Sequence, residues 1–190
     1  LGHKAIIQRT VTLAKQINGE AVAITFFPHP QSALHPDEKE FFILNTLEEK
    51  TQRLNSLGVD YLLVIPFTKE FAAIPYYEFI KVFIAERLKA KAVVIGYDHH
   101  FGSNRKGSIK HLLLLSSEYF FTVEEVPVLK INETAVSSTK IRKALLAGYI
   151  KTANLYLGYS YPFSGYLIRG NELGRKLGFP TANIEPEEKE

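Results

Sequence analysis

The sequence has 190 residues, with 23 Lys and Arg against 20 Asp and Glu and a formal net charge of +3. This length suits one domain, or one domain and the beginning of a second, and a hydrophobic content of 46% excludes a wholly disordered chain. The modest charge and the scattered basic residues argue against a nucleic-acid partner.

The chain contains no Cys, which excludes disulfides and thiolate chemistry and fits a reducing compartment. No apolar run approaches the roughly 18 residues of a membrane span, and no secretory leader opens the chain. We therefore expect a cytoplasmic protein with small-molecule partners and no membrane partner.

The first elements are a helix and a buried strand. Apolar residues recur every three or four positions over residues 4–17, which predicts an amphipathic helix that ends at Asn18-Gly19. The nearly continuous apolar run at residues 21–27 predicts a parallel strand that stops at Pro28. A polar loop is expected from there to about residue 40.

The following segments continue the alternation of helix and strand. Thr46 caps a predicted helix whose Leu54 and Leu57 face inward and which ends at Gly58. The same reasoning predicts strands at residues 61–65, 92–96, 121–126 and 128–131, and helices at residues 77–88, 109–119 and 137–147.

This alternation predicts an α/β fold, with an open, doubly wound parallel sheet covered by helices and ending near Gly158. From residue 159 onward the pattern changes to an alternating strand at residues 166–169 and a glycine-rich segment up to Asn183. About thirty residues cannot bury a core of their own. We therefore divide the chain into a domain at residues 1–158 and the incomplete start of a second module at residues 159–190.

The first candidate motif is Leu1-Gly2-His3 at the start of the first helix. In a doubly wound fold, helix N-termini at the carboxyl edge of the sheet favour phosphate, and a His there can donate to a phosphoryl oxygen. A surface His beside a helix cap is the competing interpretation.

The second motif is Ser137-Ser138-Thr139-Lys140-Ile141-Arg142 at the start of a helix. The hydroxyl groups can cap the helix or bind phosphate oxygens. A simple cap does not explain Lys140 and Arg142, because cations in a first turn oppose the helix dipole, whereas a bound polyphosphate would reverse that penalty.

The third motif is the loop at residues 96–107, which follows a strand and contains Asp98, His99 and His100. Adjacent His residues with one Asp lack the usual spacing of zinc ligands, so we expect packing or hydrogen bonding and no metal site.

The fourth motif is Phe26-Phe27-Pro28-His29-Pro30, which also lies at the carboxyl end of a strand. Aromatic residues and prolines offer a rigid apolar wall for a flat ring, and the alternative is a strand that simply stops at proline. Each motif alone is ambiguous, and their shared position at one edge of the sheet is the stronger argument.

Together these segments resemble the bacterial bifunctional riboflavin kinase/FMN adenylyltransferase family, also called FAD synthetase. Leu1-Gly2-His3 is similar to the end of the family's His-x-Gly-His motif, and residues 137–142 are similar to its Ser-Ser-Thr-x-x-Arg motif. Residues 170–183 are similar to the opening of the kinase module, including its Pro-Thr-Ala-Asn motif. The resemblance places the first His of the family motif and the preceding strand upstream of Leu1, so we expect the chain to be a fragment.

The resemblance implies that residues 1–158 transfer AMP from ATP to FMN, giving FAD and pyrophosphate, with Mg²⁺ screening the polyphosphate. His3 and Arg142 are the implied catalytic residues. The implied ATP-binding residues are Gly2, His3, Ser137, Ser138, Thr139 and Arg142. The implied flavin-binding residues are Phe26, Pro28, Pro30 and Asp98, and His99 stands where many relatives have an aromatic residue.

The family's second module is a β-barrel that phosphorylates riboflavin with ATP, and the resemblance assigns Thr181 and Asn183 to its Mg-ATP site. The rest of that barrel is missing, so residues 1–190 cannot form a complete kinase. We expect the parent polypeptide to carry that activity.

Two alternatives remain open. The chain could act on another acceptor, such as nicotinate mononucleotide or phosphopantetheine, or it could bind a flavin or nucleotide without turnover. The Pro28-His29-Pro30 wall and the kinase-like tail favour a flavin acceptor.

Overall fold

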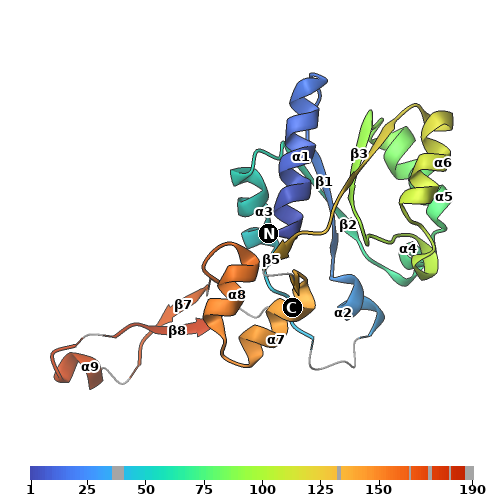
Figure 1. Ribbon diagram of the computed structural model, residues 1–190. Helices are drawn as coiled ribbons and strands as arrows, with labels where there is room; N and C mark the ends of the chain where they lie inside the picture. Colours follow the sequence, from blue (N-terminus) through green and yellow to red (C-terminus); the bar gives the residue numbers. More distant parts are fainter. Residues whose placement is uncertain (36–40, 132–133, 163, 171–172, 180, 187–190) are drawn as a thin grey trace.

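The computed structural model of the protein describes residues 1–35, 41–131, 134–162, 164–170, 173–179 and 181–186. It is a mixed α/β structure (Figure 1). The strands are β1 (Val22–Phe27), β2 (Tyr61–Pro66), β3 (Ala92–Gly96), β4 (Thr122–Val126), β5 (Lys130–Ile131), β6 (Thr134–Ala135), β7 (Gly165–Ile168) and β8 (Asn183–Pro186). The helices are α1 (Gly2–Gln16), α2 (Pro30–Leu34), α3 (Leu47–Ser56), α4 (Lys69–Ala72), α5 (Tyr76–Phe79), the π-helix η1 (Ile80–Arg87), the 3₁₀ helix η2 (Ser103–Arg105), α6 (Ile109–Tyr119), α7 (Ser138–Leu146), α8 (Ile150–Leu157) and α9 (Leu173–Lys176).

Parallel strands form the core of the structure, as the sequence predicts. β1 pairs with β2 from Val22 opposite Tyr61 to Phe27 opposite Pro66, and β3 pairs in the same way with β4. Parallel pairing places the carboxyl ends of the strands in each pair at one edge. The loops that follow β1 and β3 therefore begin at edges of the kind where ligands bind in α/β folds.

The described strands form two parallel pairs and two antiparallel pairs, β5 with β6 and β7 with β8, whereas the sequence predicted one continuous sheet. No backbone pairing joins β1 to β3 within the described residues. Side-chain packing joins the two parallel pairs instead: Ile24 of β1 packs against the main hydrophobic cluster. The buried members of this cluster are Ile80, Ile84, Ile95, Leu112 and Phe121.

Two smaller clusters hold α1, α3, α7 and α8. Val11 and Ala14 of α1 pack with Ala21 and Val59, and Leu54 of α3 packs against them, as its predicted inward orientation requires. Ile141, Ala144, Ala153 and Leu157 join α7 to α8. In Figure 1, α7 and α8 lie below α1.

Several short elements differ from the sequence-based expectation. α2 lies within the predicted polar loop, because the fixed φ of Pro30 suits a first helical turn and the His29 ring accepts a hydrogen bond from the Gln31 amide at 3.2 Å. The predicted helix at residues 77–88 is divided into α5 and η1. The elements α4, β6 and α8 were not predicted.

The N-terminus of α3 is fixed by the predicted Thr46 cap. The Thr46 hydroxyl accepts a hydrogen bond from the Glu49 amide, and the Glu49 carboxylate accepts one from the Thr46 amide, both at 3.1 Å. Glu49 also accepts a hydrogen bond from the Ser164 hydroxyl at 2.9 Å. This reciprocal capping therefore connects α3 to the segment that leads into β7.

Tyr159 provides a second connection to α3 and its approach. Its hydroxyl donates to Asn45 Oδ1 at 3.1 Å, and the Arg53 guanidinium lies over its ring, 3.3 Å from the centroid. The predicted division at residues 158/159 therefore falls at a residue that is held against α3.

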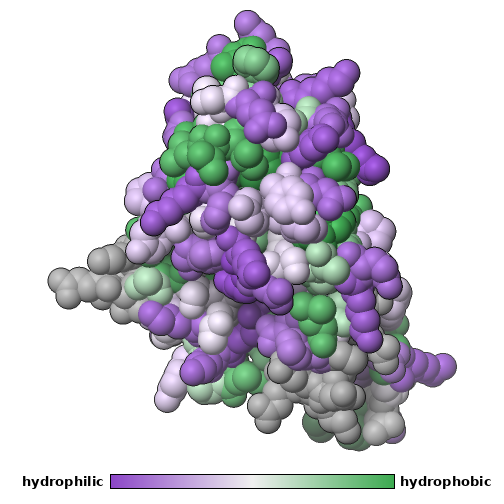
Figure 2. All heavy atoms as spheres, turned by 90° about the vertical axis from the view of Figure 1, so that its right-hand side faces the viewer, coloured by the Kyte–Doolittle hydropathy of each residue, from purple (hydrophilic) through white to green (hydrophobic). Residues whose placement is uncertain are grey.

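β7 and β8 form an antiparallel hairpin with exposed apolar side chains. Leu167 is 76% exposed and Tyr166 is 67% exposed. Elsewhere, Figure 2 shows the side of the molecule that faces right in Figure 1, where hydrophobic residues lie in several areas separated by hydrophilic ones. None of the helices in the described part of the chain combines the length and the apolar character needed to cross a membrane.

A substitution of Ile80 tests the main hydrophobic cluster, because the Ile80 side chain is completely buried. Replacing Ile80 with Ala should lower the free energy of unfolding by about 2–5 kcal/mol, since the substitution removes buried methyl groups and leaves a cavity. The urea midpoint measures the loss. The control Leu114→Ala, at a position 74% exposed, should cost less than about 0.5 kcal/mol. Equal effects of the two substitutions would contradict the assigned core.

Candidate functional site

His3 lies in the first turn of α1 and is influenced by residues from two other elements. Its side chain reaches solvent, yet the protein atoms around the imidazole desolvate it, and this is the largest cause of its lowered pKa. The positive charge of Lys50 in α3 lowers the pKa further, whereas the carboxylate of Asp98, after β3, raises it. The structure thus brings together His3 and Asp98, which the sequence analysis placed in separate subsites.

Arg142 of α7 contacts the segment that leads toward α3. Its Nε donates to the Phe42 carbonyl at 2.7 Å, and its guanidinium lies 4.5 Å from the centroid of the Phe41 ring. Within the described residues this is the only hydrogen bond of the guanidinium.

His29 connects Arg142 to the predicted flavin wall. The His29 and Phe41 rings are 4.8 Å apart. Desolvation is the largest cause of the lowered pKa of His29, and the positive charges of Arg142 and Lys50 lower it further. The predicted phosphate-binding end of α7 and the Pro28-His29-Pro30 segment therefore lie at one site.

The remaining α7 residues begin the helix as the sequence predicts. The Ser137 hydroxyl accepts a hydrogen bond from the Lys140 amide at 3.4 Å, while Ser138 and Thr139 lie in the first turn. Lys140 Nζ donates to the Ala135 carbonyl at 2.9 Å. Both cations near this helix end thus bind neutral carbonyl oxygens, and neither is neutralised by a carboxylate in the described part of the chain.

Phe26 belongs to an aromatic cluster under the predicted flavin wall. Its ring lies 5.4 Å from those of both Phe67 and Phe71. Phe27 and Pro28 at the end of β1 are exposed, and Pro30 begins α2. The strand therefore ends in an apolar surface whose base is rigidly packed.

The loop after β3 is organised by packing and hydrogen bonding, as predicted. The His99 ring stacks on Phe101 with centroids 6.4 Å apart, and His100 Nδ1 lies 3.2 Å from the Gly107 carbonyl oxygen. Desolvation is the largest cause of the lowered pKa of His99, and the positive charge of His3 contributes. Across the residues that the structure describes, no three His, Cys, Asp or Glu side chains gather in a way that could hold a metal ion.

Lys50 is a site residue that the sequence analysis missed. It is half-buried on α3, and its Nζ donates to the Thr25 hydroxyl of β1 at 3.0 Å. A cation in the first turn of a helix was noted as unusual at Lys140 and Arg142. Lys50 follows an acidic first turn in α3, so the same pattern did not mark it in the sequence.

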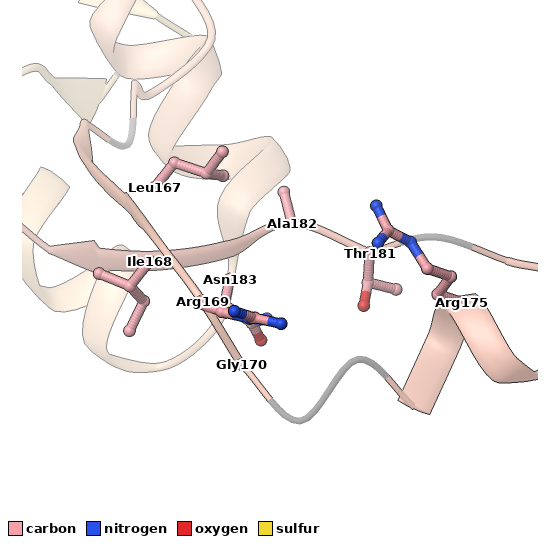
Figure 3. A pocket seen from close by; sticks show the side chains of 8 residues that line it. All are labelled: Leu167, Ile168, Arg169, Gly170, Arg175, Thr181, Ala182 and Asn183. Atoms are coloured by element: carbon pink, nitrogen blue, oxygen red, sulfur yellow. The ribbon is translucent and has the colours of Figure 1, made fainter.

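Thr181 and Asn183 lie in a separate hollow of the C-terminal hairpin. A cavity of about 400 Å³ is lined by Leu167, Ile168, Arg169, Gly170, Arg175, Thr181, Ala182 and Asn183. In Figure 3, Arg169, Gly170 and Asn183 border one end of this cavity, and Arg175 of α9 and Thr181 border the other. A side chain at Gly165 of β7 would clash with the backbone carbonyl of Glu185, so the close approach of β7 to β8 requires a glycine there, whereas one at Gly170 would meet the Asn183 side chain. Pro180 of the predicted motif lies outside the described residues.

Two family models match the sequence in consecutive segments. The FAD synthetase model matches residues 1–140, and the riboflavin kinase model matches residues 157–190. Residues 141–156, which include the rest of α7 and nearly all of α8, lie between the two matches.

Proteins named bifunctional riboflavin kinase/FMN adenylyltransferase are similar to the chain over nearly its whole length. The protein from Buchnera aphidicola (subsp. Schizaphis graminum) is 37% identical over 97% of this chain and 59% of its own length. The Listeria monocytogenes protein is 34% identical over 99% of this chain and 59% of its own length. The Escherichia coli K12 protein is 33% identical over 96% of this chain and 58% of its own length. The chain thus spans about three fifths of the relatives that it matches.

A solved structure has the same fold. The crystal structure of a Streptococcus pneumoniae protein titled macrolide-efflux protein superposes with a TM-score of 0.87 at 31% sequence identity. The match covers 99% of this chain and 60% of that one.

The three perturbed histidines give a test of the electrostatics of this site. We expect His3, His29 and His99 to titrate below the usual pKa of about 6.5, because desolvation disfavours each imidazolium. NMR titration measures these values, and His→Gln variants assign the resonances. Added tripolyphosphate should raise the pKa values of His3 and His29, because a bound anion stabilises the protonated imidazolium rings.

The sign of the effect on stability follows from the same shifts. The folded protein binds fewer protons than the unfolded chain as the pH falls through about 6.5, so the free energy of unfolding should decrease there. A pKa at or above 6.5 for all three histidines without added anion would contradict the described environment.

Proposed function

The chain belongs to the FAD synthetase family, and on that premise we propose that it transfers AMP from ATP to FMN, giving FAD and pyrophosphate. The observation that carries the proposal is the convergence of His3, Lys50 and Arg142 beside the apolar end of β1. Such a site offers positive charge and hydrogen-bond donors to phosphates next to a wall for a flat ring. The relatives are longer than this chain, and a whole protein of their length would also phosphorylate riboflavin.

We assign these activities to two parts of the chain. Residues 1–158 form a doubly wound nucleotidyltransferase-like domain, to which the family implies one further strand before Leu1. Residues 159–190 begin a β-barrel kinase module, in which Thr181 and Asn183 contact Mg-ATP. The exposed apolar side chains of β7 and β8 support this division, because an unfinished barrel exposes residues that its other strands would cover.

The reaction requires alignment rather than a covalent enzyme intermediate. An oxygen of the FMN phosphate attacks the α-phosphorus of ATP and forms the new P–O bond. The bond from the α-phosphorus to the bridging oxygen breaks, and pyrophosphate leaves with the electron pair. The protein contributes by positioning the two phosphates and by stabilising charge on the phosphoryl oxygens.

His3 and the start of α7 are assigned to ATP. The lowered pKa of His3 makes it neutral near pH 7, so one ring nitrogen can donate a hydrogen bond to an α-phosphoryl oxygen while Gly2 allows close approach. Ser137, Ser138, Thr139 and the terminal nitrogens of Arg142 would hold the triphosphate. Mg²⁺ would arrive with ATP as part of the substrate, because this ion commonly keeps phosphate and water ligands.

The flavin ring is assigned to the end of β1. Phe26, Pro28 and Pro30 would border the ring, and Asp98 would contact the flavin nucleotide. Support comes from the packed Phe26 base and from the Asp98 carboxylate, whose charge raises the pKa of His3.

The test is FAD formation from FMN, ATP and Mg²⁺ by the complete protein, followed by chromatography. Nicotinate mononucleotide and phosphopantetheine serve as competing acceptors. FAD as the sole product supports the proposal. Turnover of another acceptor would overturn the flavin assignment, and FMN binding without any turnover would favour a carrier.

Arg142→Ala tests the triphosphate site. The substitution should raise the KM for ATP by about 10- to 100-fold, because one lost charge-assisted hydrogen bond is worth about 1.5–3 kcal/mol. The KM for FMN should change much less. Arg87→Ala, at the far end of η1, is the matched control and should behave as the wild type. An unchanged ATP dependence in the Arg142 variant would remove this residue from the site.

A further inference from the structure

Lys50 is a cation without an acidic partner among the described residues. Its side chain is half-buried, and its only hydrogen bond within the described residues goes to the neutral Thr25 hydroxyl at 3.0 Å. The one ion pair in that part of the chain joins Arg9 to Glu124, on other elements. Lys50 is therefore desolvated without a compensating carboxylate there.

Lys50 directly follows the first turn of α3, in which Glu48 and Glu49 are the acidic residues. Neither carboxylate forms an ion pair with Lys50: Glu49 accepts hydrogen bonds from the Thr46 amide and the Ser164 hydroxyl, and Glu48 accepts one from the Gln52 side chain. Desolvation lowers the pKa of Lys50 in agreement with this environment. An anionic ligand would supply the missing compensation.

The position of Lys50 indicates which phosphate it meets. Thr25 directly precedes Phe26 on β1, so the Lys50 ammonium lies against the strand that carries the proposed flavin wall. Its charge also lowers the pKa of both His3, on the ATP side, and His29, on the flavin side. The charge of Lys50 thus acts on one histidine from each half of the site.

We propose that Lys50, held by Thr25, binds the phosphate of the acceptor flavin nucleotide and places it against the α-phosphate of ATP. This inference rests on the proposed function and assigns a residue to its acceptor side. The triphosphate side already has His3 and the start of α7, whereas the wall at residues 26–30 contributes no cation other than a desolvated His29. Lys50 transfers no proton in this role and acts by binding and orientation.

The experiment compares ligands that differ in the phosphate. In the complete protein, FAD formation gives the KM for FMN, the KM for ATP and the inhibition constant of lumiflavin, which has the ring system without the ribityl phosphate. Lys50→Met removes the charge and keeps an apolar stem, whereas Lys50→Arg keeps the charge. Lys110→Met, at an exposed position of α6, is the matched control.

Lys50→Met should raise the KM for FMN by about 10- to 100-fold and leave the lumiflavin constant and the KM for ATP within about twofold. Lys50→Arg should recover most of the loss, and the control should match the wild type. A KM for FMN that stays unchanged, a parallel rise in the lumiflavin constant, or a rise confined to ATP would each overturn the assignment.

Thr25→Val supplies a second variant if Lys50→Met does not fold. It removes only the hydroxyl that holds the ammonium group, and it should raise the KM for FMN by a smaller factor, about 3- to 10-fold, again without affecting lumiflavin. An unchanged KM for FMN would overturn the proposal. A wild-type protein that forms no FAD would overturn the proposed function as well, whereas FAD formation with normal Lys50 variants would overturn this inference alone.

Discussion

Uncompensated positive charge at one edge of the strands is the constraint on which the rest of the site depends. Lys50 and Arg142 are half-buried, and each donates to a neutral oxygen, the Thr25 hydroxyl and the Phe42 carbonyl. Burial of a charge without a partner is costly, so the folded protein keeps these cations at the expense of stability. Phosphate groups between them would compensate both. Desolvation is the largest cause of the lowered pKa values of His3 and His29; the charge of Lys50 lowers both further, and that of Arg142 lowers the pKa of His29.

The cap of α3 positions both this charge and the chain that follows the α/β domain. Thr46 and Glu49 fix the first turn of α3, and Lys50 immediately follows Glu49. The same Glu49 carboxylate binds Ser164, while Tyr159 contacts Asn45 and Arg53 on the same helix and its approach. One helix end therefore supports the site and the segment leading into β7. A disturbance of the cap would therefore affect both Lys50 and the segment leading into β7, because the first turn of α3 holds the two in place.

Local patterns predicted most elements, whereas contacts between distant segments could not be predicted. The apolar runs identified β1 to β4, the bounds of α6 were correct, and Thr46 was correctly identified as a cap. The separate pairing of the strands was not foreseen, because apolar runs do not specify which strands are neighbours. α8 was missed because its burial depends on packing against α7, and this packing becomes apparent only in the folded structure.

The same distinction applies to the site. His3, Asp98 and Arg142 were identified by motif and position, but their surroundings come from residues far away in the sequence. The Phe42 carbonyl is 100 residues from Arg142, and Thr25 is 25 residues from Lys50. The charged first turn of α3 resembled an ordinary solvated helix face until the structure placed it against β1. Sequence motifs therefore found the residues with recognisable spacing and missed the cation whose role depends on the fold.

Fold and family alone do not distinguish a transferase from a protein that only binds nucleotides, because a scaffold can hold different sites. The distinction lies in whether two phosphates are held next to each other. A carrier needs the ring-binding wall and one phosphate contact, and it gains nothing from a second desolvated cation. Here, Arg142 and Lys50 both influence His29 from different helices, and Lys50 also influences His3. Maintaining two such charges is costly unless two anionic groups must be brought into contact, and this requirement is the one that nucleotidyl transfer imposes.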